Sequence, residues 1–332
     1  MANTLNSERT EALSRIWQRV LGRERIGIEE SFFDLGDNPW QAVSLFREIE
    51  KEFGRLLAPI VIFQAPTIAS LAVLLDTHDC PSFPKHILLK FGDQEPPVFL
   101  THGLGGNILE FFDFAKYVRS SHAIYGLQAR GSDGLEEPCS SIEEMAETHV
   151  DAIRVLQPHG PYALVGYSLG GLVALEMARC LTASGEHIDL LVMIDSYPPL
   201  QFAPLAQRLG VYARRITHGA LRLRVSHADI PGSLGIAFTP AMQRVQECSV
   251  KALRNYRPRD YHGSIRFVRA GTPLHFPDDP AKVWTKFAPQ FEVETVPGNH
   301  HELLTTNCES LADVISRYLH ELSMGKPTGS SH

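Results

Sequence analysis

Several features that mark large classes of protein are scarce or missing in this chain of 332 residues. The five cysteines are odd in number and nowhere form a CxxC pair, so neither a disulfide framework nor a zinc site is predicted. No run of 18 apolar residues occurs, which argues against a membrane-spanning helix. The formal net charge of −7 argues against a nucleic-acid partner, because such proteins present a basic face.

A secretory signal is not expected either. The N-terminus, MANTLNSERTEAL, has no apolar core and begins directly with a polar helical pattern, so a cytoplasmic location is expected. Apolar residues make up 44% of the chain and charged residues 21%, which is typical of a soluble globular protein. The length allows one large domain and one small one, and no metal is expected in either.

Residues 4–78 are predicted to form a small all-α domain. Apolar residues recur at helical spacing along three segments. The first segment carries Leu13, Ile16, Trp17, Val20 and Leu21; the second carries Val43, Phe46, Ile49 and Phe53; the third carries Ile68, Leu71, Leu74 and Leu75 after a capping Thr67. A unit this small has a thin core and is more often an adaptor than an enzyme.

Two motifs in this domain, FFDLG at 32–36 and APTIASLAVLL at 65–75, resemble the carrier domains of nonribosomal peptide and polyketide synthases. In that family a serine after the first motif accepts a phosphopantetheine arm, which holds the acyl chain as a thioester. The matching positions here are Asp37, Asn38, Pro39 and Trp40, so Pro39, which has no hydroxyl, replaces the serine. The resemblance therefore implies a carrier fold with no covalently bound cofactor. Asn38 is expected to cap the second helix and Pro39 to occupy its first position.

The next stretch, DTHDCPSFPKH, is polar and contains two prolines, which predicts a linker at 79–85. From 86 to 324 apolar strand-like and helix-like segments alternate, the pattern of a mostly parallel, doubly wound sheet with helices on both faces. Strands are expected at 86–91, 98–101, 123–127, 162–165, 190–194, 265–269 and 291–296. Helices are expected at 107–118, 142–156, 172–183, 241–255, 280–286 and 310–322.

The alternation stops between about 197 and 240, a length that suggests a lid. Within it Leu205, Leu209, Tyr212 and Ile216 are spaced as on an amphipathic helix. The lid also carries four arginines, which we interpret as a solvated helix face, with contact to an acidic carrier or a phosphate as the alternative. These are Arg214, Arg215, Arg222 and Arg224.

The motif Gly166-Tyr167-Ser168-Leu169-Gly170 lies between a predicted strand and a predicted helix. This strand–turn–helix context makes the pattern a nucleophile elbow, in which the central side chain projects from the edge of the sheet. Glycines on both sides of the serine leave room for the backbone to pass closely. Ser168 is therefore the predicted nucleophile.

An activated serine needs a base and an acid, which in the α/β-hydrolase fold follow it in the order Asp, then His. Asp195 ends the strand after Ser168, while Asp278 and Asp279 follow a later strand. His300 and His301 lie in the loop after the last strand, and His102 comes too early in the chain to be the base. The residues alone leave the choice of acid and base open.

Residues 86–322 resemble the C-terminal thioesterase domains of the same synthases. The resemblance rests on HGLGG, YGLQARG, QPHGPYALVGYSLGG, MIDSYPP and VPGNHHELL, which agree with that family in order and spacing. It implies an α/β-hydrolase fold with Asp195 as the acid and His300 as the base. It also implies an oxyanion hole built from the backbone N–H groups of Leu104 and Leu169.

The function that this resemblance implies is release of an acyl or peptidyl chain from a phosphopantetheine thioester, by hydrolysis or cyclisation, through an acyl-enzyme at Ser168. Phosphopantetheine is then expected on the substrate, which an upstream synthase module or another carrier protein delivers. Two alternatives remain, an esterase of small free esters and a non-catalytic docking protein.

Overall fold

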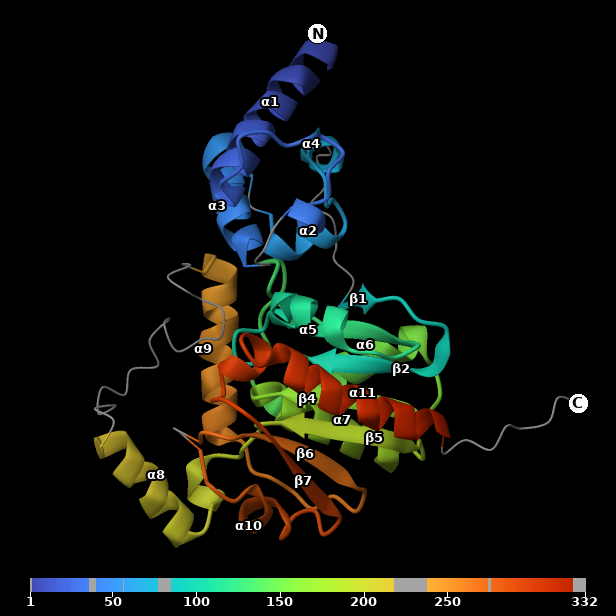
Figure 1. Ribbon diagram of the computed structural model, residues 1–332, viewed down its shortest axis with the longest axis vertical. Helices are drawn as coiled ribbons and strands as arrows, with labels where there is room; N and C mark the ends of the chain where they lie inside the picture. Colours follow the sequence, from blue (N-terminus) through green and yellow to red (C-terminus); the bar gives the residue numbers. More distant parts are fainter. Residues whose placement is uncertain are drawn as a thin grey trace, which may run out of the picture.

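The computed structural model describes residues 2–35, 40–55, 57–76, 85–217, 238–273 and 276–324. Asp37, Asn38 and Pro39, most of the predicted linker and residues 218–237 of the predicted lid lie outside these ranges. Figure 1 shows an N-terminal group of helices above a sheet that helices cover. Within the described ranges no helix is both long enough and apolar enough to cross a membrane.

The N-terminal helices enclose a small apolar core. They are α1 (Ala2–Leu21), α2 (Phe32–Leu35), α3 (Gln41–Phe53), the 3₁₀ helix η1 (Pro59–Phe63) and α4 (Ile68–Asp76). Trp17 is fully buried and meets Phe32 edge to face, with ring centroids 5.7 Å apart. As predicted, Thr67 caps α4, because its Oγ1 accepts the Ser70 N–H at 3.0 Å.

The start of the second predicted helix differs from the expectation. Helix α3 begins at Gln41, and its N-cap is Trp40, which makes no side-chain capping bond. The expected capping role of Asn38 and Pro39 falls on residues outside the described ranges. The Trp40 side chain is buried at this end of the helix and packs against Phe238.

The seven predicted strands form one sheet, with their ends shifted by a few residues. They are β1 (His86–Lys90), β2 (Gln94–Thr101), β3 (His122–Leu127), β4 (Tyr162–Tyr167), β5 (Ile188–Ile194), β6 (Ile265–Ala270) and β7 (Phe291–Val296). The order is β1-β3-β2-β4-β5-β6-β7, and every neighbouring pair is parallel except β1 with β3. Loops after β2, β4, β5, β6 and β7 therefore lie along one edge, where open α/β sheets bind ligands.

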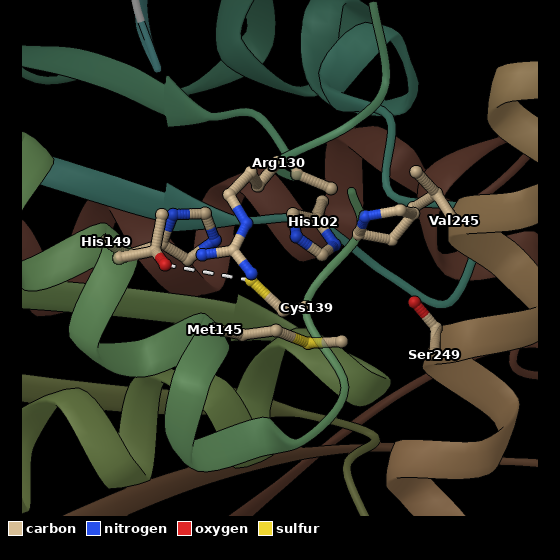
Figure 2. Close-up of a pocket in the computed structure, with 10 residues that line it drawn as sticks. His102, Arg130, Cys139, Met145, His149, Val245 and Ser249 are labelled. Atoms are coloured by element: carbon tan, nitrogen blue, oxygen red, sulfur yellow. Dashed lines mark hydrogen bonds between the residues drawn. The ribbon is translucent and has the colours of Figure 1, made fainter. Parts of the chain in front are cut away.

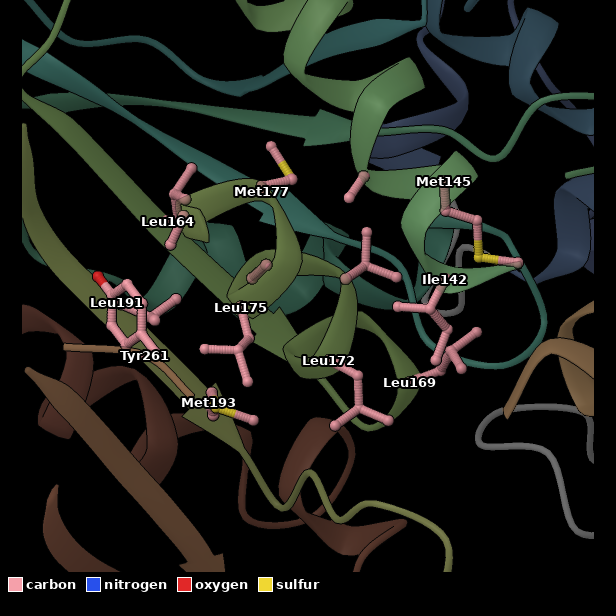
Figure 3. Packing of buried hydrophobic residues seen from close by; sticks show 14 of the residues in the cluster. Ile142, Met145, Leu164, Leu169, Leu172, Leu175, Met177, Leu191, Met193 and Tyr261 are labelled. Carbon is pink, nitrogen blue, oxygen red and sulfur yellow. The ribbon is translucent and has the colours of Figure 1, made fainter. Parts of the chain in front are cut away.

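Helices cover both faces of this sheet. They are η2 (Ile108–Phe111), α5 (Phe112–Tyr117), α6 (Ile142–Leu156), α7 (Leu169–Ala183), α10 (Pro280–Trp284), η5 (Glu302–Leu304) and α11 (Cys308–Met324). Along β4 the side chains alternate: Leu164 packs in one cluster, whereas Ala163 and Val165 pack in the other. Figure 3 shows the cluster around α6 and α7 that includes Leu164 and Met193.

The predicted lid contains η3 (Leu200–Phe202) and α8 (Leu205–Thr217), and α9 (Pro240–Asn255) follows it. The amphipathic helix occurs as predicted, but Leu205, Leu209 and Tyr212 are exposed. Arg214 is not on a solvated face: its guanidinium lies 2.6 Å from a carboxylate oxygen of Asp278. Arg222 and Arg224 lie outside the described residues.

Aromatic contacts join the N-terminal helices to the sheet domain. These contacts were not predicted from the sequence. Phe33 stacks on Phe112 with ring centroids 4.4 Å apart, and Trp40 stacks on Phe238 at 6.1 Å. The N-terminal core also includes Leu109 of η2 and Met242 of α9. The two regions thus share a continuous apolar interface instead of meeting only through the chain.

Candidate active site

Ser168 stands at the turn between β4 and α7, where the backbone is strained. Its φ of 57° and ψ of −120° are rare for a residue with a side chain. A Cβ at Gly166 would collide with the carbonyl of Gly170, and one at Gly170 would collide with the carbonyl of Thr101. Both glycines are therefore needed for α7 to start this close to the sheet.

The side chains of Ser168, His300 and Asp195, the residues that the resemblance implied, form one hydrogen-bonded chain in the structure. His300 Nε2 lies 3.0 Å from Ser168 Oγ, and His300 Nδ1 lies 2.8 Å from Asp195 Oδ2. The other carboxylate oxygen of Asp195 accepts the Ala270 N–H at 3.1 Å. With its Nδ1 proton donated to Asp195, the imidazole presents an Nε2 lone pair to the hydroxyl, the arrangement that a general base requires.

The two alternative acids, Asp278 and Asp279, form hydrogen bonds with other groups. Asp278 pairs with Arg214 of α8, and its N–H donates to Gln207 Oε1 at 2.8 Å. Asp279 caps α10 by accepting the Lys282 N–H at 3.3 Å. The loop after β6 therefore binds α8 through Asp278, whereas the loop after β5 places Asp195 beside His300.

The alternative base also lies outside the hydrogen-bonded chain. The His301 ring packs edge to face against the His300 ring, with centroids 5.6 Å apart. The His301 N–H donates to Asn299 Oδ1 at 3.0 Å, so this residue helps to fold the loop that presents His300. Of the two histidines, His300 makes the hydrogen bond with Ser168.

Two aromatic residues that the sequence analysis missed position His300. The Tyr167 ring stacks on the imidazole with centroids 4.8 Å apart, and its hydroxyl donates to the His300 carbonyl at 2.8 Å. Burial raises the pKa of Tyr167 well above its ordinary value, so the hydroxyl keeps its proton. Phe276 contacts the imidazole with centroids 4.9 Å apart. Tyr167 is the variable residue of the Gly-x-Ser motif, so the motif itself does not identify it.

The predicted oxyanion donors belong to two segments beside the serine. Leu169 is the first residue of α7, so its N–H has no acceptor within the helix. Leu104 belongs to the loop of residues 102–106, which we call the oxyanion loop. The neighbouring Gly103 is held on both sides: its N–H donates to Glu110 Oε1 at 2.7 Å, and its carbonyl lies 2.8 Å from His102 Nδ1.

Glu110 is a buried carboxyl that sequence reasoning did not single out. It is 8% exposed, and burial raises its pKa to about 8, an effect that the Gly103 N–H partly offsets. A glutamate in an apolar helical segment gives no signal of this role, because the contact depends on how η2 folds back onto the loop. Among the described residues, no group of three or more His, Cys, Asp or Glu side chains is placed to hold a metal ion.

Comparison with known proteins agrees with this architecture. Residues 96–319 match the thioesterase domain family, and residues 11–75 match the phosphopantetheine attachment site family. The chain is 32% identical over 279 residues to a dimodular nonribosomal peptide synthase of Bacillus subtilis (strain 168), covering 78% of this chain and 12% of that protein. It is 38% identical over 263 residues to malpinin synthetase of Mortierella alpina, covering 78% of this chain and 3% of that protein. The chain thus spans a small part of the length of these relatives.

Solved structures show the same fold. A four-domain nonribosomal peptide synthetase bound to AMP and glycine aligns with 96% of this chain and 26% of its own, at a TM-score of 0.61 and 21% identity. The NocB thioesterase domain in covalent complex with a fluorophosphonate nocardicin G analog aligns with 68% of this chain and 95% of its own, at a TM-score of 0.51 and 28% identity. The chain therefore belongs to the thioesterase domain family, a family of serine hydrolases, and carries a carrier-type helical domain in front of it.

Proposed function

We propose that this chain releases a finished acyl or peptidyl chain from a phosphopantetheine thioester at the end of a nonribosomal peptide or polyketide assembly line. The observation that carries the proposal is the hydrogen-bonded chain from Ser168 Oγ through His300 to Asp195. The chain divides into a carrier-like domain at 4–78, a linker at 79–85 and a thioesterase domain at 86–324 with a lid at about 197–240.

In the acylation step, His300 Nε2 takes the Ser168 proton while Oγ attacks the thioester carbonyl. Asp195 holds the imidazole by Nδ1 and stabilises the imidazolium that forms. The C–S bond of the tetrahedral intermediate then breaks, and the departing sulfur receives the proton from His300. The products are an acyl-enzyme at Ser168 and the free thiol of the arm.

Negative charge develops on the carbonyl oxygen during this step. The N–H groups of Leu104 and Leu169 are the donors for that oxygen, one from the oxyanion loop and one from the first turn of α7. Loss of one such donor typically lowers kcat by about 10²–10³. The positive end of the α7 dipole adds to the same effect.

In the second step His300 accepts a proton from the attacking nucleophile, which adds to the acyl carbonyl, and Ser168 Oγ leaves with that proton. If the nucleophile is water, the product is a free acid. If it is an amine or hydroxyl of the acyl chain itself, the product is a ring. Both outcomes use the same residues, so the choice depends on whether water or the chain end occupies the space above Ser168.

The carrier-like domain does not fit a phosphopantetheine arm. Position 39 is proline, which has no hydroxyl to form the phosphodiester. We therefore propose that the acyl chain arrives on another carrier, from an upstream synthase module, and that the domain at 4–78 acts in docking. Its apolar contact with the thioesterase domain, through Phe33 and Phe112, supports this role.

A mass measurement tests the missing arm. Incubation with a phosphopantetheinyl transferase and CoA should leave the mass of the protein unchanged. The Pro39→Ser variant, which restores a hydroxyl at the same position, is the positive control and should gain one arm. A gain by the unaltered chain would show that another side chain accepts the arm.

A panel of pantetheine thioesters tests the reaction itself. The wild-type protein should form an acyl adduct that intact-mass spectrometry detects, and the adduct should resolve to acid or ring. Ser168→Ala should form no adduct, while Asp278→Asn, which changes the alternative acid, should form it at a rate close to wild type. Equal loss in Asp278→Asn and Asp195→Asn would contradict the assignment of the acid.

A further inference from the structure

The direction of the Leu104 N–H is set by the peptide to which it belongs. The carbonyl of Gly103 and the N–H of Leu104 share one planar peptide and point in opposite directions. The Gly103 oxygen is fixed by two groups, the Gly106 N–H at 3.1 Å and His102 Nδ1 at 2.8 Å. The His102 ring therefore helps to aim the N–H that we assign to the oxyanion hole.

This contact identifies the tautomer of His102. A carbonyl oxygen only accepts hydrogen bonds, so His102 Nδ1 must carry the proton. Burial lowers the pKa of His102, so the ring is neutral and its Nε2 is a bare acceptor. Across the described residues, Nε2 is buried without a hydrogen-bond partner. A buried acceptor of this kind needs a donor.

His102 lines a cavity together with His149 of α6 and Ser249 of α9 (Figure 2). These three residues are at most 1% exposed. In the described part of the chain both ring nitrogens of His149 and the Ser249 hydroxyl are also without a partner. The rings of His102 and His149 lie edge to face with centroids 5.3 Å apart. The cavity volume is about 10 Å³, close to the space that one water needs.

The charge of the cavity selects its ligand. Burial, and the neighbouring His102, lower the pKa of His149 well below its ordinary value, so neither ring is charged. Arg130 also lines the cavity, but its guanidinium bonds the Glu144 carboxylate and the Glu137 carbonyl. The ligand must therefore be neutral, small, and both donor and acceptor, which describes water.

We propose that His149 and Ser249 bind a water molecule that donates a hydrogen bond to His102 Nε2 and thereby holds the tautomer that aims the Leu104 N–H. His149 and Ser249 are then positioning residues, which act on the reaction through the oxyanion loop. The effect on rate rests on the proposed thioesterase reaction, whereas the tautomer and the water are properties of the resting protein.

Kinetics of Ser249→Ala in the full chain test the effect on the reaction. With a pantetheine thioester, kcat should fall about tenfold, part of the loss seen when an oxyanion donor is removed. KM should stay unchanged, because the contact strengthens only in the transition state. Affinity for a trifluoromethyl ketone should fall in parallel with kcat. Thr148→Val, which lines the same cavity but whose hydroxyl already bonds the Glu144 carbonyl, is the matched control and should keep its kcat.

The same variant can also contradict the proposal. If Ser249→Ala keeps its kcat and unfolds at a higher temperature, the hydroxyl has no partner and the proposal is wrong, because removal of an unpaired buried polar group stabilises a protein. His149→Phe is a second variant, which should lower kcat in the same way while leaving KM unchanged.

Nitrogen NMR of wild-type protein labelled with ¹⁵N-histidine gives a test that needs neither turnover nor a variant. His102 should show a protonated Nδ1 and an Nε2 shift of a hydrogen-bonded acceptor, and Ser249→Ala should move the Nε2 shift toward that of a free acceptor. A proton on Nε2 in the wild type would overturn the proposal. If thioesters are not turned over but these shifts are as expected, the proposed function fails and the water site stands.

Discussion

Replacement of Glu110 by glutamine tests whether the carboxyl group that binds the oxyanion loop is uncharged. Glu110 is buried behind the loop, and its Oε1 accepts the Gly103 N–H at 2.7 Å. A glutamine keeps the size of the side chain and the oxygen that accepts this bond, but it never ionises. The variant therefore isolates the free energy of ionising the buried group.

The direction of the pH effect on the free energy of unfolding follows from the protonation of Glu110 in the native and unfolded states. Burial raises the pKa of Glu110 from 4.5 to about 8 in the native protein. Between these two values the unfolded chain has released the proton and the native state retains it. The free energy of unfolding of the wild type therefore falls as pH rises through this window and levels off above about 8. At 1.36 kcal/mol for each pKa unit, the total loss is at most about 5 kcal/mol.

Urea unfolding of wild type and Glu110→Gln between pH 5 and pH 9 measures this difference. The stability of the variant relative to wild type should increase steadily up to about pH 8 and then remain constant. Glu147→Gln, at an exposed position of α6, is the control for the loss of one carboxyl from the surface. A relative stability that is independent of pH, or that favours the wild type at high pH, would refute the reasoning and show a carboxylate that the fold stabilises.

Three further predictions concern the acid Asp195, the packing of helix α7 and the interface between the domains. Asp195→Asn should lower kcat by about four orders of magnitude, because the imidazole loses the partner that fixes its tautomer; stopped-flow acylation by a pantetheine thioester measures it. Gly171→Ala should lower the melting temperature, with a loss of about 1–3 kcal/mol, because the new Cβ would collide with the Ser196 side chain. Gly210→Ala in α8, where a Cβ would make only ordinary contacts, is its control and should not destabilise the protein. Phe112→Ala removes the ring that stacks on Phe33 and should increase the radius of gyration in small-angle scattering, while turnover of a small soluble thioester stays unchanged.

Most of the strands were predictable because they are short apolar runs bounded by polar residues or glycine, whereas β7 (FEVETV) alternates apolar and polar residues. Parallel strands put their carboxyl ends at one edge, and the structure pairs β4 with β5, so Ser168 after β4 and Asp195 after β5 are neighbours. His300 follows β7, two strands farther along the sheet, and reaches Ser168 through the loop after that strand. Chain order alone therefore allowed the triad but did not specify its geometry.

The choice between Asp195 and Asp278 shows where sequence reasoning ended. Both carboxylates follow a strand on the correct side of Ser168, and local pattern does not distinguish them. What separates them is a long-range contact, the Arg214–Asp278 ion pair between α8 and the loop after β6. The interface of Phe33 with Phe112 was missed for the same reason, since each phenylalanine has an ordinary place in its own helical segment.

Among the described residues, the two non-glycine positions with positive φ are Ser168, at 57°, and Asp195, at 45°. Glycine would adopt both conformations without strain, yet the chain has a hydroxyl and a carboxylate there. Each is held by a neighbouring strand: the Ser168 N–H donates to the Ile194 carbonyl at 2.9 Å, and the Asp195 N–H donates to the Val268 carbonyl at 2.7 Å. The sheet ladder thus continues one bond past the end of β4 and of β5 and fixes the two strained residues. Because the strain coincides with the two side chains on either side of His300, it is best explained by the chemistry that those side chains serve.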